Sequence, residues 1–167
     1  MQLVLENIFR FILLVLVQVF VLDNIQFLGY VSPMIYVLFL LSLPVRLPGW
    51  AQLLLAFGIG LTIDMFSNTM GMHAFASVLT AFARNSVINL FVSSEEISRP
   101  TPSFRSFGVS AYIKYIVVLV LLHHSALFLI ESFSFINISL LIPKILISSL
   151  VTILLILGTK SLFKSRR

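Results

Sequence analysis

Seven ionisable side chains within or beside the long apolar stretches of this sequence could support chemistry: Asp23, Asp64, His73, His123, His124, Glu131 and Lys144. The histidines could bind a metal ion or relay a proton, because imidazole is the commonest metal ligand and titrates near neutral pH. His123 and His124 are adjacent, so their rings would point about 100° apart on a helix and would need a third ligand, such as His73, to share a metal. Glu131 follows His124 by two helical turns and lies on the same face. We favour the alternative in which all three histidines are hydrogen-bonded polar residues inside a helix bundle.

The charged residues of the apolar stretches need partners. A charge deep in a bilayer costs about 2.5 to 3.5 kcal/mol on insertion scales and usually faces a partner or a wet cavity. We hypothesise that Asp64 pairs with Lys144 across two helices; in the alternative, Lys144 extends outward to the membrane surface. Asp23 and Asp64 could form a carboxylate dyad if their helices were adjacent, but a role for each as a helix cap or polar anchor is favoured.

Several enzyme motifs are missing from the sequence. It contains no H-E-x-x-H, no G-x-S-x-G and no Gly-rich phosphate-binding loop, which mark metalloproteases, serine hydrolases and nucleotide-binding enzymes. It also contains no Cys, which excludes disulfides, iron–sulfur clusters and cysteine-based zinc sites. We therefore predict a protein that is not an enzyme, with no catalytic residue, no cofactor and no bound metal.

The composition indicates whether water or lipid surrounds the chain. Of its 167 residues, 59% are hydrophobic and only 10% are charged, against about 25% charged in a soluble domain. The formal net charge of +5 could suggest nucleic acid as a partner, but Lys and Arg stand singly between apolar blocks and in a C-terminal cluster. This distribution is typical of a chain oriented in a membrane. We therefore predict the lipid bilayer as solvent and no nucleic-acid partner, and exclude a soluble enzyme and a disordered tail.

The helices that must position these residues can be read from the apolar runs, because a spanning helix needs roughly 20 mostly apolar residues. Six segments approach this length, at about 5–22, 33–43, 50–65, 70–91, 111–130 and 138–157. The second is short and is broken by Pro44 and Pro48, so it spans only if 27–30 extend it, and it could instead be re-entrant. We predict a single all-α integral membrane domain over 1–167, a compact bundle of six transmembrane helices.

The positive charges predict the orientation of this bundle. With the N-terminus inside, the inner side carries ten of the Lys and Arg residues, and the outer side carries Lys144 with Asp23, Asp64 and Glu131. Because Lys and Arg accumulate in short cytoplasmic loops, both termini are expected in the cytoplasm. The polar stretch 93–110 then becomes a cytoplasmic loop, and 158–167 a basic cytoplasmic tail.

Small residues and a turn mark the junction between the third and fourth segments. Ala56-x-x-x-Gly60 would let a neighbouring backbone approach closely. Residues 58–74 read G-I-G-L-T-I-D-M-F-S-N-T-M-G-M-H-A, which resembles the Gly-Leu-x-x-Asp, short turn, Leu-Gly-x-x-Ala signature of the rod shape-determining MreD family, with Met70 at the usual Leu. The resemblance extends over nearly the whole chain through V-L-D-N-I at 21–25, P-M-I-Y at 33–36, L-P-G-W at 47–50 and the adjacent histidines at 123 and 124.

The resemblance implies a non-catalytic inner-membrane subunit of the bacterial cell-elongation machinery. Members of this family associate with MreC, and through it with the RodA-type glycosyltransferase, its class B penicillin-binding transpeptidase and the MreB filament. Their fold is similar to that of the substrate-binding subunits of energy-coupling-factor transporters. On this basis Asp64 and His73 would shape the outer turn, and Gly60 and Gly71 would let its backbone bend.

Two functional classes remain open at this point. The first is an assembly scaffold that docks MreC and helps to position the peptidoglycan synthases. The second is a solute-binding subunit of the energy-coupling-factor type, which needs an outward-facing pocket with a few polar groups among apolar walls. The polar candidates on that side are Asp23, Asp64, His73 and Glu131.

Overall fold

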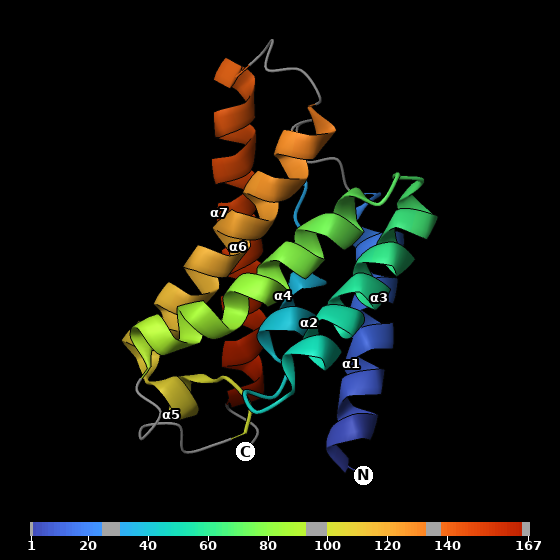
Figure 1. Ribbon diagram of the computed structural model, residues 1–167. Helices are drawn as coiled ribbons and strands as arrows, with labels where there is room; N and C mark the ends of the chain where they lie inside the picture. Colours follow the sequence, from blue (N-terminus) through green and yellow to red (C-terminus); the bar gives the residue numbers. More distant parts are fainter. Residues whose placement is uncertain (1, 25–30, 93–99, 133–137, 165–167) are drawn as a thin grey trace.

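The computed structural model describes residues 2–24, 31–92, 100–132 and 138–164, which form a bundle of helices (Figure 1). Five helices are long and apolar enough to cross a membrane. They are α1 (Gln2–Val17), continued by the π-helical turn η1 (Gln18–Leu22), α3 (Gly49–Ser67), α4 (Met72–Phe91), α6 (Val109–Glu131) and α7 (Ile138–Lys164). The chain is therefore an all-α protein with several apolar helices of membrane-spanning length, as its composition predicts.

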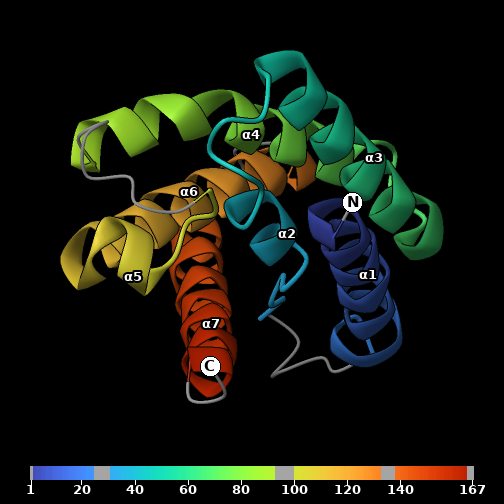
Figure 2. The ribbon, with the colours of Figure 1, turned by 90° about the horizontal axis from the view of Figure 1, so that it is seen from below.

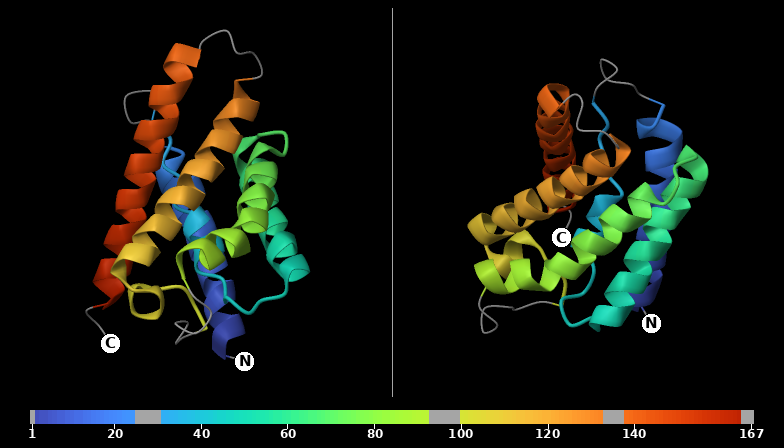
Figure 3. Two further views of the ribbon diagram at one scale, coloured as in Figure 1. Left: turned by 60° about the vertical axis from the view of Figure 1, so that its left-hand side comes forward. Right: turned by 45° about the horizontal axis from the view of Figure 1, so that its top comes forward.

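The predicted second span is not a long helix. Within 31–48 only α2 (Val37–Leu41) is α-helical, because the prolines before and after it limit the helix, so the predicted count of six transmembrane helices is not confirmed. The extension by 27–30 lies outside the described residues. Figure 1 shows 31–48 running from the end of the bundle that holds η1 to the end where α1 begins. The start of α1 and the end of α7 consequently lie at the same end (Figures 1 and 3).

The segment around α2 forms the centre of the molecule rather than an outer helix. Seen along the bundle in Figure 2, α2 is surrounded by α1, α4, α6 and α7. Every side chain from Met34 to Leu43 is buried, with exposed fractions of 7% or less. Irregular backbone is tolerated at membrane depth only where protein surrounds it, because lipid offers no hydrogen bonds. The apolar composition of this segment thus reflects a protein core and not a lipid-facing surface.

The extended part of this segment is bound by hydroxyl groups of α7. The backbone N–H of Ser32 donates to Ser148 Oγ at 3.1 Å, and the N–H of Met34 donates to Thr152 Oγ1 at 3.0 Å. Both hydroxyl side chains are fully buried. They replace the neighbouring strand or helical turn that would otherwise accept these protons.

Apolar side chains on the outer faces and polar side chains in the interior are the distribution expected of a protein in an apolar solvent. Large apolar side chains are exposed on the outer faces of the long helices, for example Phe9, Leu54, Phe82 and Leu150. Polar side chains from the same helices point inward, where they contact each other and the α2 segment. This inversion supports the membrane assignment, because a soluble bundle would expose its polar groups.

The predicted polar loop at 93–110 packs partly against the bundle. Residues 93–99 lie outside the described residues, but α5 (Phe104–Phe107) buries Phe107 and places the Phe104 ring 4.8 Å from that of Tyr112. The N–H of Val45 donates to Pro100 O at 2.8 Å, which ties this region to the end of the α2 segment. At the C-terminus, α7 continues into the predicted basic tail as far as Lys164, and 165–167 lie outside the described residues.

Candidate functional site

The turn between α3 and α4 is organised by Asp64. Its carboxylate accepts hydrogen bonds from the backbone N–H groups of His73 at 3.0 Å and Ala74 at 2.9 Å, and from the Thr69 hydroxyl. The two backbone N–H groups belong to the first turn of α4, where they have no acceptor within the helix. The residue at the N-cap position of that helix is Gly71, which has no side chain to cap with. A carboxylate from the preceding helix performs this role and also compensates the positive end of the helix dipole.

Two glycines permit this turn. A Cβ atom on Gly60 would lie 2.5 Å from Ala74 Cα and 2.6 Å from His73 O, so α3 and α4 touch through bare backbone at this point. Gly71 has φ +80°, in the left-handed region that favours glycine. The positive φ of Gly71 agrees with the prediction that this residue lets the backbone bend. Gly60 lies within α3, where it permits the close approach of the two helices and does not bend the turn.

Tyr36 of the central segment joins two of the three histidines. Its hydroxyl lies 2.9 Å from His73 Nδ1 and 2.8 Å from His123 Nε2. A phenol has one proton, so it donates to one ring and accepts from the other. His123 Nδ1 is buried and has no hydrogen-bond partner among the described residues. Because an orphaned buried N–H is rarer than an orphaned acceptor, we assign the protons to Nε2 of both rings, with the Tyr36 hydroxyl donating to His73.

The third histidine belongs to a second hydrogen-bonded chain. His124 Nδ1 lies 3.0 Å from Val120 O, which can only accept, so that nitrogen carries the proton. Its Nε2 therefore accepts from the Thr152 hydroxyl at 3.1 Å, and Thr152 Oγ1 in turn accepts the N–H of Met34. The structure thus places all three histidines in the interior, hydrogen-bonded to protein groups. No cluster of three or more His, Asp or Glu side chains within the described ranges is arranged to hold a metal ion.

The predicted pair between Asp64 and Lys144 is wrong. Lys144 Nζ lies 3.0 Å and 3.1 Å from the two carboxylate oxygens of Glu131 and 4.4 Å from the centre of the Phe128 ring. Glu131 ends α6 and Lys144 stands near the start of α7, so the hairpin between these helices brings them together. Asp64 is held by the N-terminus of α4 instead. Lys144 is also not simply extended toward solvent, since only 26% of its side chain is exposed.

A polar cluster that sequence reasoning missed holds the end of the α2 segment. The Arg84 guanidinium donates to Leu43 O, to Gln52 Oε1 at 3.0 Å and, through Nε, to the Tyr115 hydroxyl at 3.0 Å. Tyr115 donates onward to Leu41 O at 3.0 Å. The sequence prediction counted Arg84 among the charges of the inner side, but it is fully buried. The available signal was its position, seven residues before the end of α4 and inside an apolar run.

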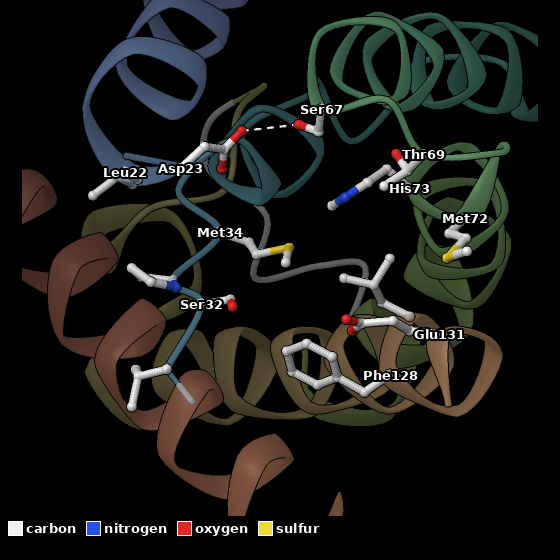
Figure 4. A pocket seen from close by; sticks show the side chains of 13 residues that line it. Leu22, Asp23, Ser32, Met34, Ser67, Thr69, Met72, His73, Phe128 and Glu131 are labelled. Carbon is white, nitrogen blue, oxygen red and sulfur yellow. Dashed lines mark hydrogen bonds between the residues drawn. The ribbon is translucent and has the colours of Figure 1, made fainter. Parts of the chain in front are cut away.

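A pocket with a cavity volume of about 270 Å³ opens at the end of the bundle away from the chain termini (Figure 4). Three of the four predicted outer polar residues line it, namely Asp23, His73 and Glu131, which Figure 4 shows on different sides of the cavity. Asp64 does not line it. The remaining wall consists of Ser32, Ser67, Thr69 and apolar residues that include Leu22, Met34, Met72 and Phe128.

Asp23 anchors one rim of this pocket. One carboxylate oxygen accepts from Gln18 Nε2 at 2.7 Å and the other accepts from the Ser67 hydroxyl at 2.9 Å. The same Gln18 amide donates to Pro33 O at 3.1 Å, which ties the start of η1 to the central segment. Asp23 and Asp64 therefore have separate sets of partners and do not form the dyad that was considered.

No family model matches the chain, and no curated protein and no solved structure is significantly similar to it. Its function must therefore be argued from the geometry of these residues and from the resemblance of its sequence motifs.

Proposed function

We propose that this protein is a non-catalytic inner-membrane subunit of the bacterial cell-elongation complex, of the MreD type. In this role it binds MreC and helps to position the RodA-type glycosyltransferase and the class B penicillin-binding transpeptidase, with the MreB filament engaged indirectly. Its contribution is partner stabilisation without turnover.

The observation that carries the proposal is the correspondence between the MreD-like motif and the α3–α4 hairpin. Gly60 lies against the α4 backbone, Asp64 binds the first N–H groups of α4 and Gly71 has a positive φ. The residues at the motif positions thus hold the α3–α4 hairpin together. This is the role expected of a sequence motif that specifies a fold. The buried polar residues His124 and Arg84 likewise bind backbone carbonyls. This arrangement suits a rigid adaptor that offers helix faces to membrane partners.

The experiment that tests the proposal is affinity purification of the tagged full chain from its native membrane in mild detergent, followed by mass spectrometry. Recovery of MreC together with the elongation synthases is expected. The matched control is the same tagged chain with Gly60→Leu, in which the hairpin cannot close, and it should recover little MreC. Recovery of neither MreC nor a synthase by the unaltered chain would contradict the scaffold role. Equal recovery of MreC by both chains would show that binding does not depend on the closed hairpin.

The proposal includes an orientation, with both chain termini in the cytoplasm. Figure 1 shows α5 and the start of α6 at the end of the bundle where α1 begins, and the start of α7 at the other end. The sequences of α5 and of the start of α6 contain Arg105 and Lys114, and that of the start of α7 contains Lys144. The positive-inside rule then favours the cytoplasm for the first of these ends.

Because the sequence contains no Cys, single cysteines can report this orientation without further changes. Met70, on the α3–α4 turn, is 96% exposed, and Arg105 on α5 is also exposed. We expect a membrane-impermeant maleimide to label Met70→Cys in intact spheroplasts, and Arg105→Cys only after the membrane is permeabilised. The reverse pattern would invert the orientation, and labelling of both in intact spheroplasts would exclude this topology.

The pocket favours a second candidate function, a solute-binding membrane subunit of the energy-coupling-factor type. Its walls are mostly apolar with a few polar side chains, as small-molecule sites are. In the same purification, recovery of a transporter ATPase pair and a coupling subunit in place of MreC would support this function over the scaffold role.

A further inference from the structure

The acidic and basic side chains that line the pocket are unequal in number. Two carboxylates, Asp23 and Glu131, line it, and the described lining includes no Lys or Arg. The segments 25–30 and 133–137, which continue from lining residues, contain no Lys, Arg or His in the sequence. The cavity is therefore formally anionic, with both carboxylates exposed at its rim, where salt in the solvent screens their charge.

Asp23 carries the uncompensated charge. Its two hydrogen bonds within the described part of the chain come from neutral donors, the Gln18 amide and the Ser67 hydroxyl, and no cationic side chain there pairs with it. These bonds hold the carboxylate in a fixed position without neutralising it. A cation that enters the pocket would find a pre-oriented anion at its rim.

The protein itself already holds an ammonium group at the opposite rim. Lys144 Nζ binds both oxygens of Glu131 and stands 4.4 Å from the centre of the Phe128 ring, and both Glu131 and Phe128 line the pocket. A carboxylate beside an aromatic face is a favourable environment for an ammonium ion. Lys144 shows which chemical group this wall accepts, although its own side chain comes from α7 and is not part of the lining.

The remaining wall can hold the body of a small ligand. Met34, Leu127 and Phe128 offer apolar surface, and His73 lies at the pocket with its Nδ1 engaged by Tyr36. The proton arrangement assigned above leaves an Nε2–H on His73 as a donor at this site. A cavity of about 270 Å³ lies just below the range of about 300 to 1,000 Å³ typical of drug-sized ligands, which restricts the occupant to a small molecule.

We propose that this pocket binds a small organic cation, an ammonium group on a short apolar or aromatic body, with Asp23 as its main counter-ion. The inference deepens the second candidate function, because it requires the pocket to admit a solute. It is independent of whether the chain also binds MreC.

Benzylammonium is a suitable probe, with benzyl alcohol and benzoate as neutral and anionic probes of the same size. Each is titrated into the full chain in lipid nanodiscs and followed by isothermal titration calorimetry and saturation-transfer NMR. We expect benzylammonium to bind roughly fivefold more tightly than benzyl alcohol at low salt, with benzoate weakest and the preference shrinking as salt is added. Equal binding of benzylammonium and benzyl alcohol would overturn the cation preference and leave the solute-binding function standing. Binding of none of the three to folded protein would overturn both.

Three variants locate the effect. Asp23→Asn should weaken benzylammonium binding roughly fivefold and leave benzyl alcohol unchanged. Lys144→Met should strengthen it roughly threefold, because Glu131 loses its resident cation, and a gain of binding does not arise from misfolding. The matched control is Lys114→Met, which removes an ammonium 5.9 Å from the Phe91 ring on helices α6 and α4, away from the pocket, and it should change nothing. Unchanged affinity in both Asp23→Asn and Lys144→Met would overturn the assignment of this site.

Discussion

Replacing Gly60 with alanine is expected to lower the free energy of unfolding by about 3 kcal/mol. The added Cβ would lie 2.5 Å from Ala74 Cα, 2.6 Å from His73 O and 2.7 Å from Ala74 N, distances that real Cβ atoms do not show. All three neighbours are backbone atoms, so the helices must separate. That movement would also stretch the hydrogen bonds that the Asp64 carboxylate accepts from the first turn of α4.

The measurement is reversible unfolding in mixed micelles with increasing SDS, followed by circular dichroism. Gly58→Ala, in the same helix, is the matched control, because a Cβ at Gly58 would contact no atom of a neighbouring element within 4 Å. It should stabilise the protein by up to about 1 kcal/mol through the higher helix propensity of alanine. Equal effects of the two substitutions would show that α3 and α4 do not touch at Gly60.

Replacing Arg84 with methionine has the second large expected effect, a loss of about 3 kcal/mol. The methionine fills much of the same space but leaves Leu43 O and Gln52 Oε1 without the donor that they now share. Each buried acceptor left unpaired costs about 1 to 3 kcal/mol. Removal of the buried guanidinium returns part of this loss, because its desolvation is costly.

Arg84→Lys separates charge from geometry in the same unfolding experiment. An ammonium keeps the charge but cannot reproduce the planar fork that reaches Leu43 O, Gln52 and Tyr115 together. We expect a loss of about 2 kcal/mol, so that the lysine recovers little of the stability. Full recovery by lysine would mean that the charge alone holds the end of the α2 segment, and a neutral effect of methionine would mean that the cluster adds no stability.

The positions of the long helices and of the α3–α4 turn could be predicted from the sequence. Long apolar runs place the five long helices within a few residues at most of their ends, because a helix in lipid satisfies its own backbone and needs only length and apolarity. The exception is α7, which continues past the predicted end near 157 to Lys164. The α3–α4 turn was also predictable, since Gly60, Asp64 and Gly71 stand close together in the sequence and act within one hairpin.

The central segment marks the limit of this approach. Residues 33–43 have the composition of a short spanning helix, yet they are buried on all sides and only partly helical. The side chains that bind the backbone of 32–43 come from helices far along the chain; they are Ser148, Thr152, Arg84 and Tyr115. Hydropathy measures whether a segment avoids water, and it does not distinguish burial in lipid from burial in protein.

The partners of the charged and polar side chains also could not be predicted from the sequence. Local composition and spacing are enough to predict a membrane protein, the positions of its long helices and the few places where its polar residues stand. The partners of these polar residues depend on how the helices pack: Lys144 pairs with Glu131, Tyr36 joins His73 to His123, Arg84 is buried, and Asp23, His73 and Glu131 surround one cavity. A buried polar group takes whichever partner this packing brings within hydrogen-bond distance, and the packing is not encoded at any single position.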